Sequence, residues 1–426
     1  MMPHQIALTV LAPVKAGEAE KLKGVLTSLG DGGPPAGALP FGRLPMVHFA
    51  RLFVLDEAKD LTGAHIPAQV VFLTDLDAPR HRYLRRLVKL AGETLDRIFD
   101  HCEGYPDPGQ RTVGSRLTYL HGHTVKADTV YVNTIGRSVR QVRQEAALHE
   151  SIQAFLDRPD QQWSGRRATE IHAAISRLVA EDDELRWALE PARPPGRIWR
   201  MRQALHFVAV PLLVLLLAPV LLLAAPFWLI ALRRHERTDP EPDIKLDHAR
   251  AEEVAGFEDH VVQNPLSAVG AIKPGRFRLL TTLGVLRLID YTTRHIFNRG
   301  SLAGITTIHF ARWVFIDDRR RLVFASSYDG SLESYMDDFI DKVAWGLNAV
   351  FSNGIGYPRT RWLVLDGASD EQAFKKFLRS YQVPTQFWYS AYDNLTNANI
   401  ANNAAIRAGL AGPMSAEETE RWLRRL

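Results

Sequence analysis

The sequence predicts an α+β fold made of two copies of one unit, with a hydrophobic segment between them. Two observations predict this. Residues 207–232 form an apolar run without a charged side chain, and a sequence pattern found before this run recurs after it. A chain of 426 residues is long enough for two or three domains. We therefore expect a duplicated protein with a membrane segment between its halves.

The repeat is clearest around a histidine and an arginine that recur with similar neighbours. Residues 47–56 read VHFARLFVLD, and residues 308–317 read IHFARWVFID. Residues 70–77, VVFLTDLD, match residues 322–329, LVFASSYD, at an offset of 252. Agreement over two separate segments in the same order indicates an internal duplication.

Apolar periodicity predicts the same order of elements in both copies. For the first copy we expect strands at 5–11, 47–56, 68–73 and 129–132, with helices at 16–29 and 79–101. For the second copy we expect strands at 267–272, 306–316, 321–326, 361–366 and 385–389, with helices at 276–297, 331–351 and 394–410. The shared order is β-α-β-β-α-β, the ferredoxin-like pattern.

The predicted organisation has six parts. They are a ferredoxin-like unit over residues 1–155, a helical connector over 156–202, a membrane segment over 203–234, a linker over 235–258, a second ferredoxin-like unit over 259–412 and a C-terminal helix over 413–426. Two homologous units on one chain are expected to pack together, here as an intramolecular α/β barrel.

The apolar run is the strongest single signal in the chain. A spanning helix needs about 20 apolar residues, and this run has 26. A buried core helix of a soluble protein keeps a polar stripe, and this run has none. The residues that we expect to contact the membrane include Phe207, Pro211, Pro219, Pro226, Trp228 and Leu232.

Two topologies remain open for this segment. Proline removes a backbone donor and kinks or breaks a helix. Arginines flank both ends of the run, and the positive-inside rule places such flanks in the cytoplasm. A hairpin that turns near Pro219 satisfies both observations and keeps both units on the cytoplasmic side. A single span is the alternative.

Composition limits the classes of partner. The chain is 46% apolar and 23% charged, which is typical of a globular protein. Its net charge of +4 is mild, and the arginines beside the apolar run favour anionic membrane lipid as a partner. The sequence lacks a stripe of basic residues interleaved with aromatic ones, which is the pattern that would indicate nucleic-acid binding. The one cysteine, Cys102, excludes an internal disulfide.

The duplication and the element order resemble the dimeric α/β-barrel superfamily, which includes chlorite dismutases and dye-decolourising peroxidases. The segments HFARW and SSYDGS are also similar to those of a membrane-attached bacterial family. The peroxidases carry a Gly-x-x-Asp-Gly signature whose aspartate works above a haem. Asp329-Gly330 corresponds to the end of that signature, but Ser326 stands at its first glycine. The resemblance implies haem as a cofactor, with His295 as the available proximal ligand.

His309, Arg312 and Asp329 are the candidate catalytic residues. His309 and Arg312 lie on opposite faces of the predicted strand, and both faces are largely apolar. A buried histidine or arginine needs a partner, so each either serves a reaction or ties the strand to a neighbour. Their recurrence as His48 and Arg51 favours the structural interpretation. Asp329 also precedes a helix, where aspartate is a favoured cap.

Other polar and aromatic residues of the second copy are candidates for an amphipathic binding pocket. They are Trp313, Tyr328, Trp388, Tyr389, Tyr392, Asn264 and Arg276. The alternative is that the aromatic side chains form part of the core. No Cys/His cluster has zinc-binding spacing, so no metal site is predicted.

These observations favour a membrane-attached protein that binds or processes an apolar, lipid-like small molecule in a cavity between the two units. A haem peroxidase of the dye-decolourising kind is one alternative. A non-catalytic membrane scaffold is the other.

Overall fold

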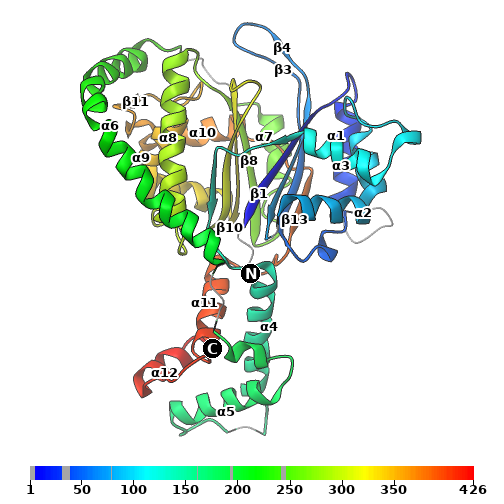
Figure 1. The fold of residues 1–426 in the computed structure, drawn as a ribbon, viewed down its shortest axis with the longest axis vertical. Coiled ribbons are helices and arrows are strands. Elements are labelled where there is room, and N and C mark those ends of the chain that lie inside the picture. Colours follow the sequence, from blue (N-terminus) through cyan, green and yellow to red (C-terminus); the bar gives the residue numbers. More distant parts are fainter. Residues whose placement is uncertain (1–4, 31–38, 78, 161, 192–194, 241–245) are drawn as a thin grey trace.

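The structure, a computed structural model, describes residues 5–30, 39–77, 79–160, 162–191, 195–240 and 246–426. It contains two larger antiparallel sheets, one of five strands and one of four. Helices cover their outer faces, and a group of helices projects beyond one end of the sheets (Figure 1). The fold is therefore of the predicted α+β class.

The first sheet contains the strands predicted around His48. Its order is β13-β2-β5-β1-β6, where the strands are β1 (Ile6–Pro13), β2 (Val47–Leu55), β5 (Gln69–Leu76), β6 (Thr124–Val125) and β13 (Phe387–Ser390). Three helices accompany it, α1 (Ala19–Gly30), α2 (Arg80–Phe99) and α3 (Val113–Gly122). The apolar face predicted for α2 is buried against the sheet, because Leu84, Leu87 and Leu95 belong to one core cluster with Val10 and Phe72.

The second sheet contains the strands predicted around His309. Its order is β7-β9-β10-β8, where the strands are β7 (Thr129–Val132), β8 (Gln263–Ala271), β9 (Ile308–Ile316) and β10 (Arg321–Asp329). The helices that follow its strands are α8 (Arg276–His295), α9 (Leu332–Phe351) and α10 (Glu371–Tyr381). Strand β9 is buried over its whole length, as its two apolar faces predict.

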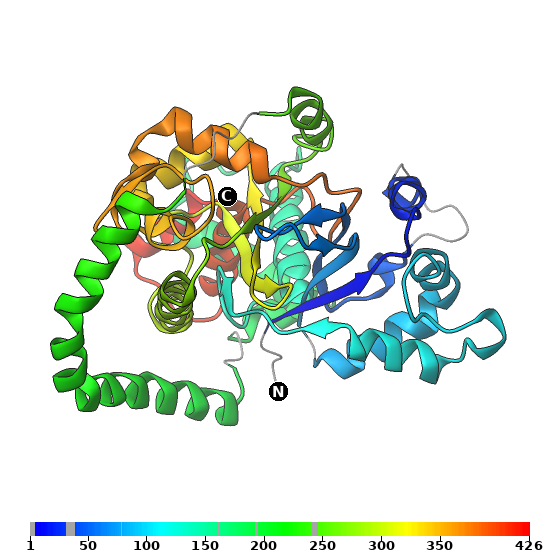
Figure 2. The same ribbon diagram turned by 90° about the horizontal axis from the view of Figure 1, so that it is seen from above.

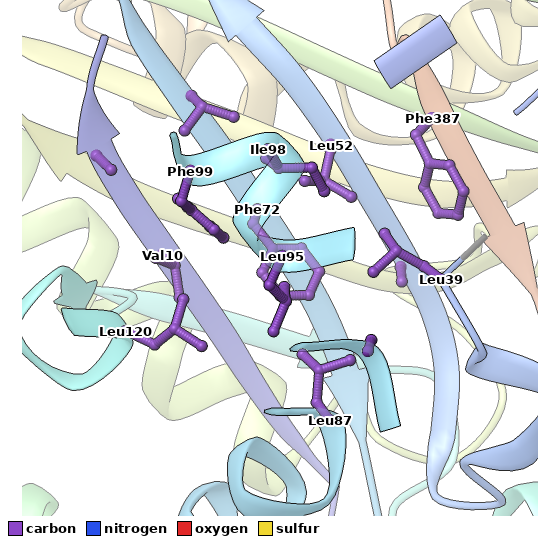
Figure 3. Close-up of a cluster of buried hydrophobic side chains, with 14 of the residues drawn as sticks. Val10, Leu39, Leu52, Phe72, Leu87, Leu95, Ile98, Phe99, Leu120 and Phe387 are labelled. Carbon is purple, nitrogen blue, oxygen red and sulfur yellow. The ribbon is translucent and has the colours of Figure 1, made fainter. Parts of the chain in front are cut away.

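The two halves exchange their last strands. β7 comes from the first half and pairs with β9, whereas β13 comes from the second half and pairs with β2. The two pairings are equivalent, because in each the exchanged strand lies opposite the recurring arginine. Val130 lies opposite Arg312, and Trp388 lies opposite Arg51. Figure 3 shows Phe387 of β13 within the core of the first half.

This exchange corrects the sequence prediction, which placed each last strand in its own unit. The physical reason is that, without β13 and β7, the strands β2 and β9 would each end a sheet with an open hydrogen-bonding edge. Periodicity within a strand identifies its buried face but not the edge on which it pairs.

The two sheets pack face to face. Phe53 and Val71 of the first sheet join Val314 and Val323 of the second in one buried cluster. Side chains therefore fill the space between the sheets. In the part of the chain that the structure describes, the cavity between the two histidines at the end of the sheets has a volume of about 30 Å³.

The helices beyond the end of the sheets come from both halves (Figure 1). They are α4 (Val139–Leu156), α5 (Ala168–Glu181), α11 (Asn397–Ala408) and α12 (Ala416–Leu423). Leu148 and Ile152 of α4 pack with Ile175 of α5, Ile406 of α11 and Trp422 of α12. These four helices therefore share a hydrophobic core that is separate from the sheets, and the predicted connector contributes α5 to it.

The apolar run forms the middle of helix α6 (Arg197–Thr238), which contains all three prolines. Its most apolar window has a mean hydropathy of 2.9 and no buried residue, so by length and composition α6 is a candidate membrane span. Figures 1 and 2 show that it is bent and that both ends return to the second half of the molecule. The chain does not reverse at Pro219, where a hairpin turn was predicted, since the helix continues through this residue. Proline bends a helix, but the backbone hydrogen bonds on either side of it can continue.

The remaining elements are short. They are the hairpin β3 (Ala58–Lys59) and β4 (His65–Ile66), helix α7 (His248–Ala255), the pair β11 (Thr360–Arg361) and β12 (Leu365–Asp366), and 3₁₀ turns at Phe41–Arg43, Pro108–Gln110, Arg186–Leu189 and Gly367–Ser369. The strand predicted at 361–366 is instead a tight hairpin, because Trp362 and Leu363 adopt left-handed backbone angles. Of the predicted linker over 235–258, residues 241–245 lie outside the described ranges.

Candidate functional site

Two buried histidine–aspartate pairs lie at the end of the sheets that faces the helices α4 and α11. His48 Nε2 is 2.7 Å from a carboxylate oxygen of Asp77, and His309 Nε2 is 2.6 Å from a carboxylate oxygen of Asp329. All four side chains are buried. Since a carboxylate accepts hydrogen bonds, each Nε2 carries the proton that it donates.

Each aspartate also receives the first amide of a helix beyond the sheets. The second carboxylate oxygen of Asp77 accepts a hydrogen bond from Val139 N at 2.6 Å, and that of Asp329 accepts one from Asn397 N at 2.7 Å. These amides begin α4 and α11. The aspartates thus fix the two helices to the strand ends through a charge-assisted hydrogen bond.

This result corrects one detail of the capping interpretation. Asp329 was expected to cap the helix that directly follows it, but Ser331 caps that helix through Ser334 N. Asp329 instead accepts the first amide of α11, a helix that begins almost 70 residues later in the chain and whose N-cap residue is Thr396. Sequence proximity favoured the wrong helix.

A small cavity separates the two histidines. It is lined by His48, His309, Gln5, Val132, Asn133, Thr134, Arg137, Val142, Phe310, Tyr392, Asn397 and Ile400. Its volume of about 30 Å³ has room for one or two water molecules. The cavity is therefore too small for a lipid-like substrate or a haem.

Tyr392 connects one histidine to the cavity. Its hydroxyl lies 2.7 Å from Nδ1 of His48. Burial, together with the nearby carboxylate of Asp77, raises the pKa of Tyr392 well above its usual value. The phenol therefore stays protonated and donates to Nδ1, which completes a chain of hydrogen bonds from Tyr392 through His48 to Asp77.

The recurring arginines form a second, reciprocal set of contacts between the halves. Nη1 of Arg51 donates to the carbonyl of Leu266 at 2.8 Å, and Nη2 donates to the carbonyl of Ser326 at 2.8 Å. Nη1 of Arg312 donates to the carbonyl of Leu8 at 2.7 Å, and its Nη2 pairs with Asp75. Each arginine thus joins its own sheet to two strands of the other sheet.

The two arginine sites differ in one respect. Arg312 meets a carboxylate, that of Asp75, where Arg51 meets the hydroxyl of Ser327. Burial lowers the pKa of Arg51 to about 9. The contacts of both arginines lie in the interface between sheets, so they favour the structural interpretation of Arg312.

The other predicted ligand-binding residues do not gather in one pocket. Tyr328 and Trp313 lie in the core of the second half, where the ring of Tyr328 stacks on Tyr335 at 4.0 Å. Asn264 donates to the carbonyl of Gly330 and so holds a turn. Arg276 is exposed at the start of α8.

The aromatic residues of β13 pack against the first half. Trp388 stacks on Phe49 at 5.4 Å, and the guanidinium of Arg51 lies 5.0 Å from the Trp388 ring. Tyr389 packs against Phe41. Of the aromatic residues between Phe387 and Tyr392, only Tyr392, which follows β13, lines the cavity between the histidines.

The residues that a haem would use do not fit that group. Both carboxylate oxygens of Asp329 already have donors, and the space beside it is about 30 Å³. Nε2 of His295 lies 2.8 Å from Nδ1 of His206 on α6. Among the described residues, no three His, Cys, Asp or Glu side chains form a group that could hold a metal ion.

Three residues near the histidines were missed by sequence reasoning. They are Asn133, Arg137 and Asn397, and they line the cavity through the loops that lead into α4 and α11. The offset of 258 residues that relates β7 to β13 also relates Val139 to Asn397, but residues 129–139 (TVYVNTIGRSV) and 387–397 (FWYSAYDNLTN) share almost no sequence. This relation therefore becomes visible only from the strand pairing.

Comparisons with protein-family models, with curated proteins and with solved structures give no match to this chain. The function is therefore argued from geometry alone.

Proposed function

We propose that this chain is a membrane-attached protein that binds an apolar, lipid-like molecule beside α6, with both halves on one side of the bilayer. The observation that carries the proposal is that both ends of α6 rest on α8, while the facing surfaces between those ends are apolar and uncovered. The basic flanks of α6 favour the cytoplasmic side.

The contacts at the two ends of α6 support a single-sided attachment. At its start, Phe207 accepts a hydrogen bond from the Tyr291 hydroxyl at 3.0 Å, near the C-terminal end of α8. At its end, Asp239 pairs with Arg278 at 2.7 Å, near the first turn of α8. α8 belongs to the core of the second half, so a straight span that separates the two ends of α6 across a bilayer would break one set of contacts.

Helix lengths explain the bend. At about 1.5 Å per residue, the 20 residues of α8 extend about 30 Å. The stretch of α6 between its two contacts, from Phe207 to Asp239, would extend about 48 Å if it were straight. The stretch must therefore bow outward, and its three prolines allow it to do so. A bowed apolar helix can lie within one leaflet.

The face of α8 that the bow leaves open is apolar. Phe277, Leu280, Gly284, Leu288 and Tyr291 follow helical spacing along one side. The outer two contact α6, but Leu280 is 65% exposed and Leu288 is 62% exposed. Soluble proteins rarely leave so large an apolar surface uncovered. Acyl chains are the occupant that suits an opening bordered by a membrane helix.

We also propose that the two halves are ferredoxin-like units of one intramolecular α/β barrel. The equivalent strand exchange and the matched arginine and histidine contacts support this. The lipid site differs from the one expected from the sequence, because packed side chains fill the interface between the sheets.

Native mass spectrometry of the detergent-purified protein tests the binding proposal. A Cβ at Gly284 would meet no atom within 4 Å, so the backbone there has room for a side chain, and Gly284→Trp places a large ring in the opening. Gly24→Trp, on an exposed position of α1 that is equally open, is the matched control. We expect stoichiometric lipid on the unsubstituted protein and on the control, and its loss from Gly284→Trp.

An empty unsubstituted protein that still sediments with vesicles would overturn lipid binding and favour the scaffold. Equal lipid on both tryptophan variants would show that the occupant lies elsewhere.

A further inference from the structure

A second, larger pocket lies where the chain enters α6. Its volume is about 390 Å³, and it is lined by Thr134, Ile135, Arg137, Pro195, Trp199, Asn298, Arg299, Gly300 and Ala401. The lining contains two arginines and no acidic residue. Trp199 lies in the first turn of α6, and residues 298–300 follow the end of α8. The pocket therefore lies just beyond the contacts between α6 and α8 that close this end of the opening.

Arg137 is partly buried without a carboxylate partner among the described residues. The carboxylate of Glu145 acts on Arg137 through its charge alone. Its Oε1 accepts hydrogen bonds from Gln141 at 2.8 Å and from Arg407 at 3.2 Å, and its buried Oε2 has no hydrogen-bond partner among the described residues. Burial lowers the pKa of Arg137. A partly buried guanidinium is stabilised by a hydrogen-bond acceptor, and among the described residues the Arg137 guanidinium donates no hydrogen bond.

The adjoining cavity between the two histidines contains a donor without an acceptor. Thr134 and Arg137 also line the cavity between the two histidines, so the two spaces adjoin. Nδ2 of Asn397 is buried on that cavity and has no hydrogen-bond partner in the described structure. The side chain of Asn397 is more than nine-tenths buried. Unsatisfied buried donors are costly, so an acceptor from a ligand or water belongs here.

The residues that line the pocket in the first half differ from those at the equivalent positions of the second half. At the offset of 258 residues, Thr134 corresponds to Tyr392 and Arg137 corresponds to Leu395. In the second half, therefore, a tyrosine and a leucine stand where the first half has a small residue and a cation. A contact needed only for packing would be expected in both halves, as the arginines of β2 and β9 are.

We propose that this pocket binds the phosphate or carboxylate of an anionic head group, presented by a lipid whose chains lie beside α6. Arg137 and Arg299 supply the charge, since guanidinium groups bind such oxyanions through paired hydrogen bonds. Trp199 lies at the start of the apolar helix, at the level where tryptophan borders a membrane interface. The inference rests on the proposed lipid binding and names the class of lipid.

The test uses the full chain in neutral detergent and isothermal titration calorimetry. The probes are a short-chain phosphatidic acid, a phosphatidylcholine of the same chains, and inorganic phosphate. The variants are Arg137→Gln and Arg299→Gln, and the control is Arg140→Gln, an exposed arginine that does not line the pocket. Arg299 is exposed, so its substitution is not expected to affect folding.

We expect phosphatidic acid to bind at least about tenfold more tightly than phosphatidylcholine, and each pocket variant to lose about tenfold in affinity for phosphatidic acid alone. The control should match the unsubstituted protein. Equal affinity for both lipids, or unchanged affinity in both pocket variants, would overturn the anion site. If Gly284→Trp still displaces lipid in that case, the proposed function stands without it.

Titration with inorganic phosphate distinguishes a lipid head group from free phosphate as the source of the anion. Phosphate that binds as tightly as phosphatidic acid, and weakens equally in Arg137→Gln, would overturn the lipid as the source of the head group.

Discussion

At the scale of single residues, the chain uses the same side chains twice for the same contacts. Arg51 and Arg312 cross the interface between the sheets in opposite directions. His48 and His309 hold the aspartates that receive the first amides of α4 and α11. The recurrence of these residues in the sequence therefore reflects a shared packing role, and the residues that differ between halves indicate function.

The difference between the two arginine sites predicts unequal losses of stability. Arg312→Met leaves the buried Asp75 carboxylate without its cation, which should lower the free energy of unfolding by about 3–5 kcal/mol. Arg51→Met leaves only neutral acceptors unsatisfied and should cost about 1–3 kcal/mol. Urea unfolding in detergent measures both. A larger loss for Arg51→Met would contradict the assignment, and Asp75→Asn should restore part of the loss in Arg312→Met.

The aspartates make a second residue-scale prediction. Asp329→Ala removes the acceptor for both His309 and Asn397 N, so we expect a loss of about 1–3 kcal/mol and faster amide exchange in the first turn of α11. Asp329→Asn keeps one acceptor oxygen and should lose less. Asp77→Ala should have the same effect on α4.

Lipid retention separates the two interpretations of Asp329. A structural aspartate leaves lipid retention unchanged in the folded Asp329→Asn variant. Loss of lipid without loss of stability would make Asp329 a functional residue.

At the scale of elements, the sequence predicted most strands and helices but not their partners. The pattern around His309 predicted a strand buried on both faces, and the last strand of the first copy was placed at the residues where β7 lies. The pairing of that strand with the opposite sheet could not be predicted, because side-chain alternation carries no information about which edge accepts a strand. The cavity residues were missed for the same reason, since exchanged strands and their following loops bring them together.

The attachment of the C-terminal end of α6 gives a prediction about one element. The buried carboxylate of Glu236 pairs with Arg233 and accepts hydrogen bonds from Leu363 N at 2.7 Å and from Trp362 N at 3.2 Å. Glu236→Leu should therefore speed amide exchange at Trp362 and Leu363 by about tenfold or more. Arg234→Leu, at a neighbouring exposed position, is the control. Unchanged exchange in Glu236→Leu would show that the hairpin holds α6 by other contacts.

At the scale of the whole molecule, the strand exchange makes the two halves one folded unit. The candidate membrane helix α6 is held to that unit near both of its ends, and its first turn borders the pocket that contains Arg137. The duplication and the apolar run were visible in the sequence. Their relation was not, because it depends on contacts of α6 with α8, which begins 38 residues after the end of α6.

Single-cysteine labelling tests the central claim of a one-sided attachment. The native Cys102 is buried, and burial raises the pKa of its thiol to about 12. The raised pKa in the folded state stabilises the fold fully below the unfolded value near 9, and this contribution is lost as the pH rises above 9. At pH 8 a maleimide should therefore react with Cys102 only after unfolding, which leaves introduced cysteines as the sites of labelling.

The measurement places Arg202→Cys and Arg237→Cys, both exposed and on opposite ends of the apolar run, in sealed membrane vesicles of known orientation. A membrane-impermeant maleimide is then added from outside. We predict that both positions are labelled in vesicles of one orientation and that both are protected in vesicles of the other. Labelling of the two positions in opposite orientations would establish a single span and contradict the account.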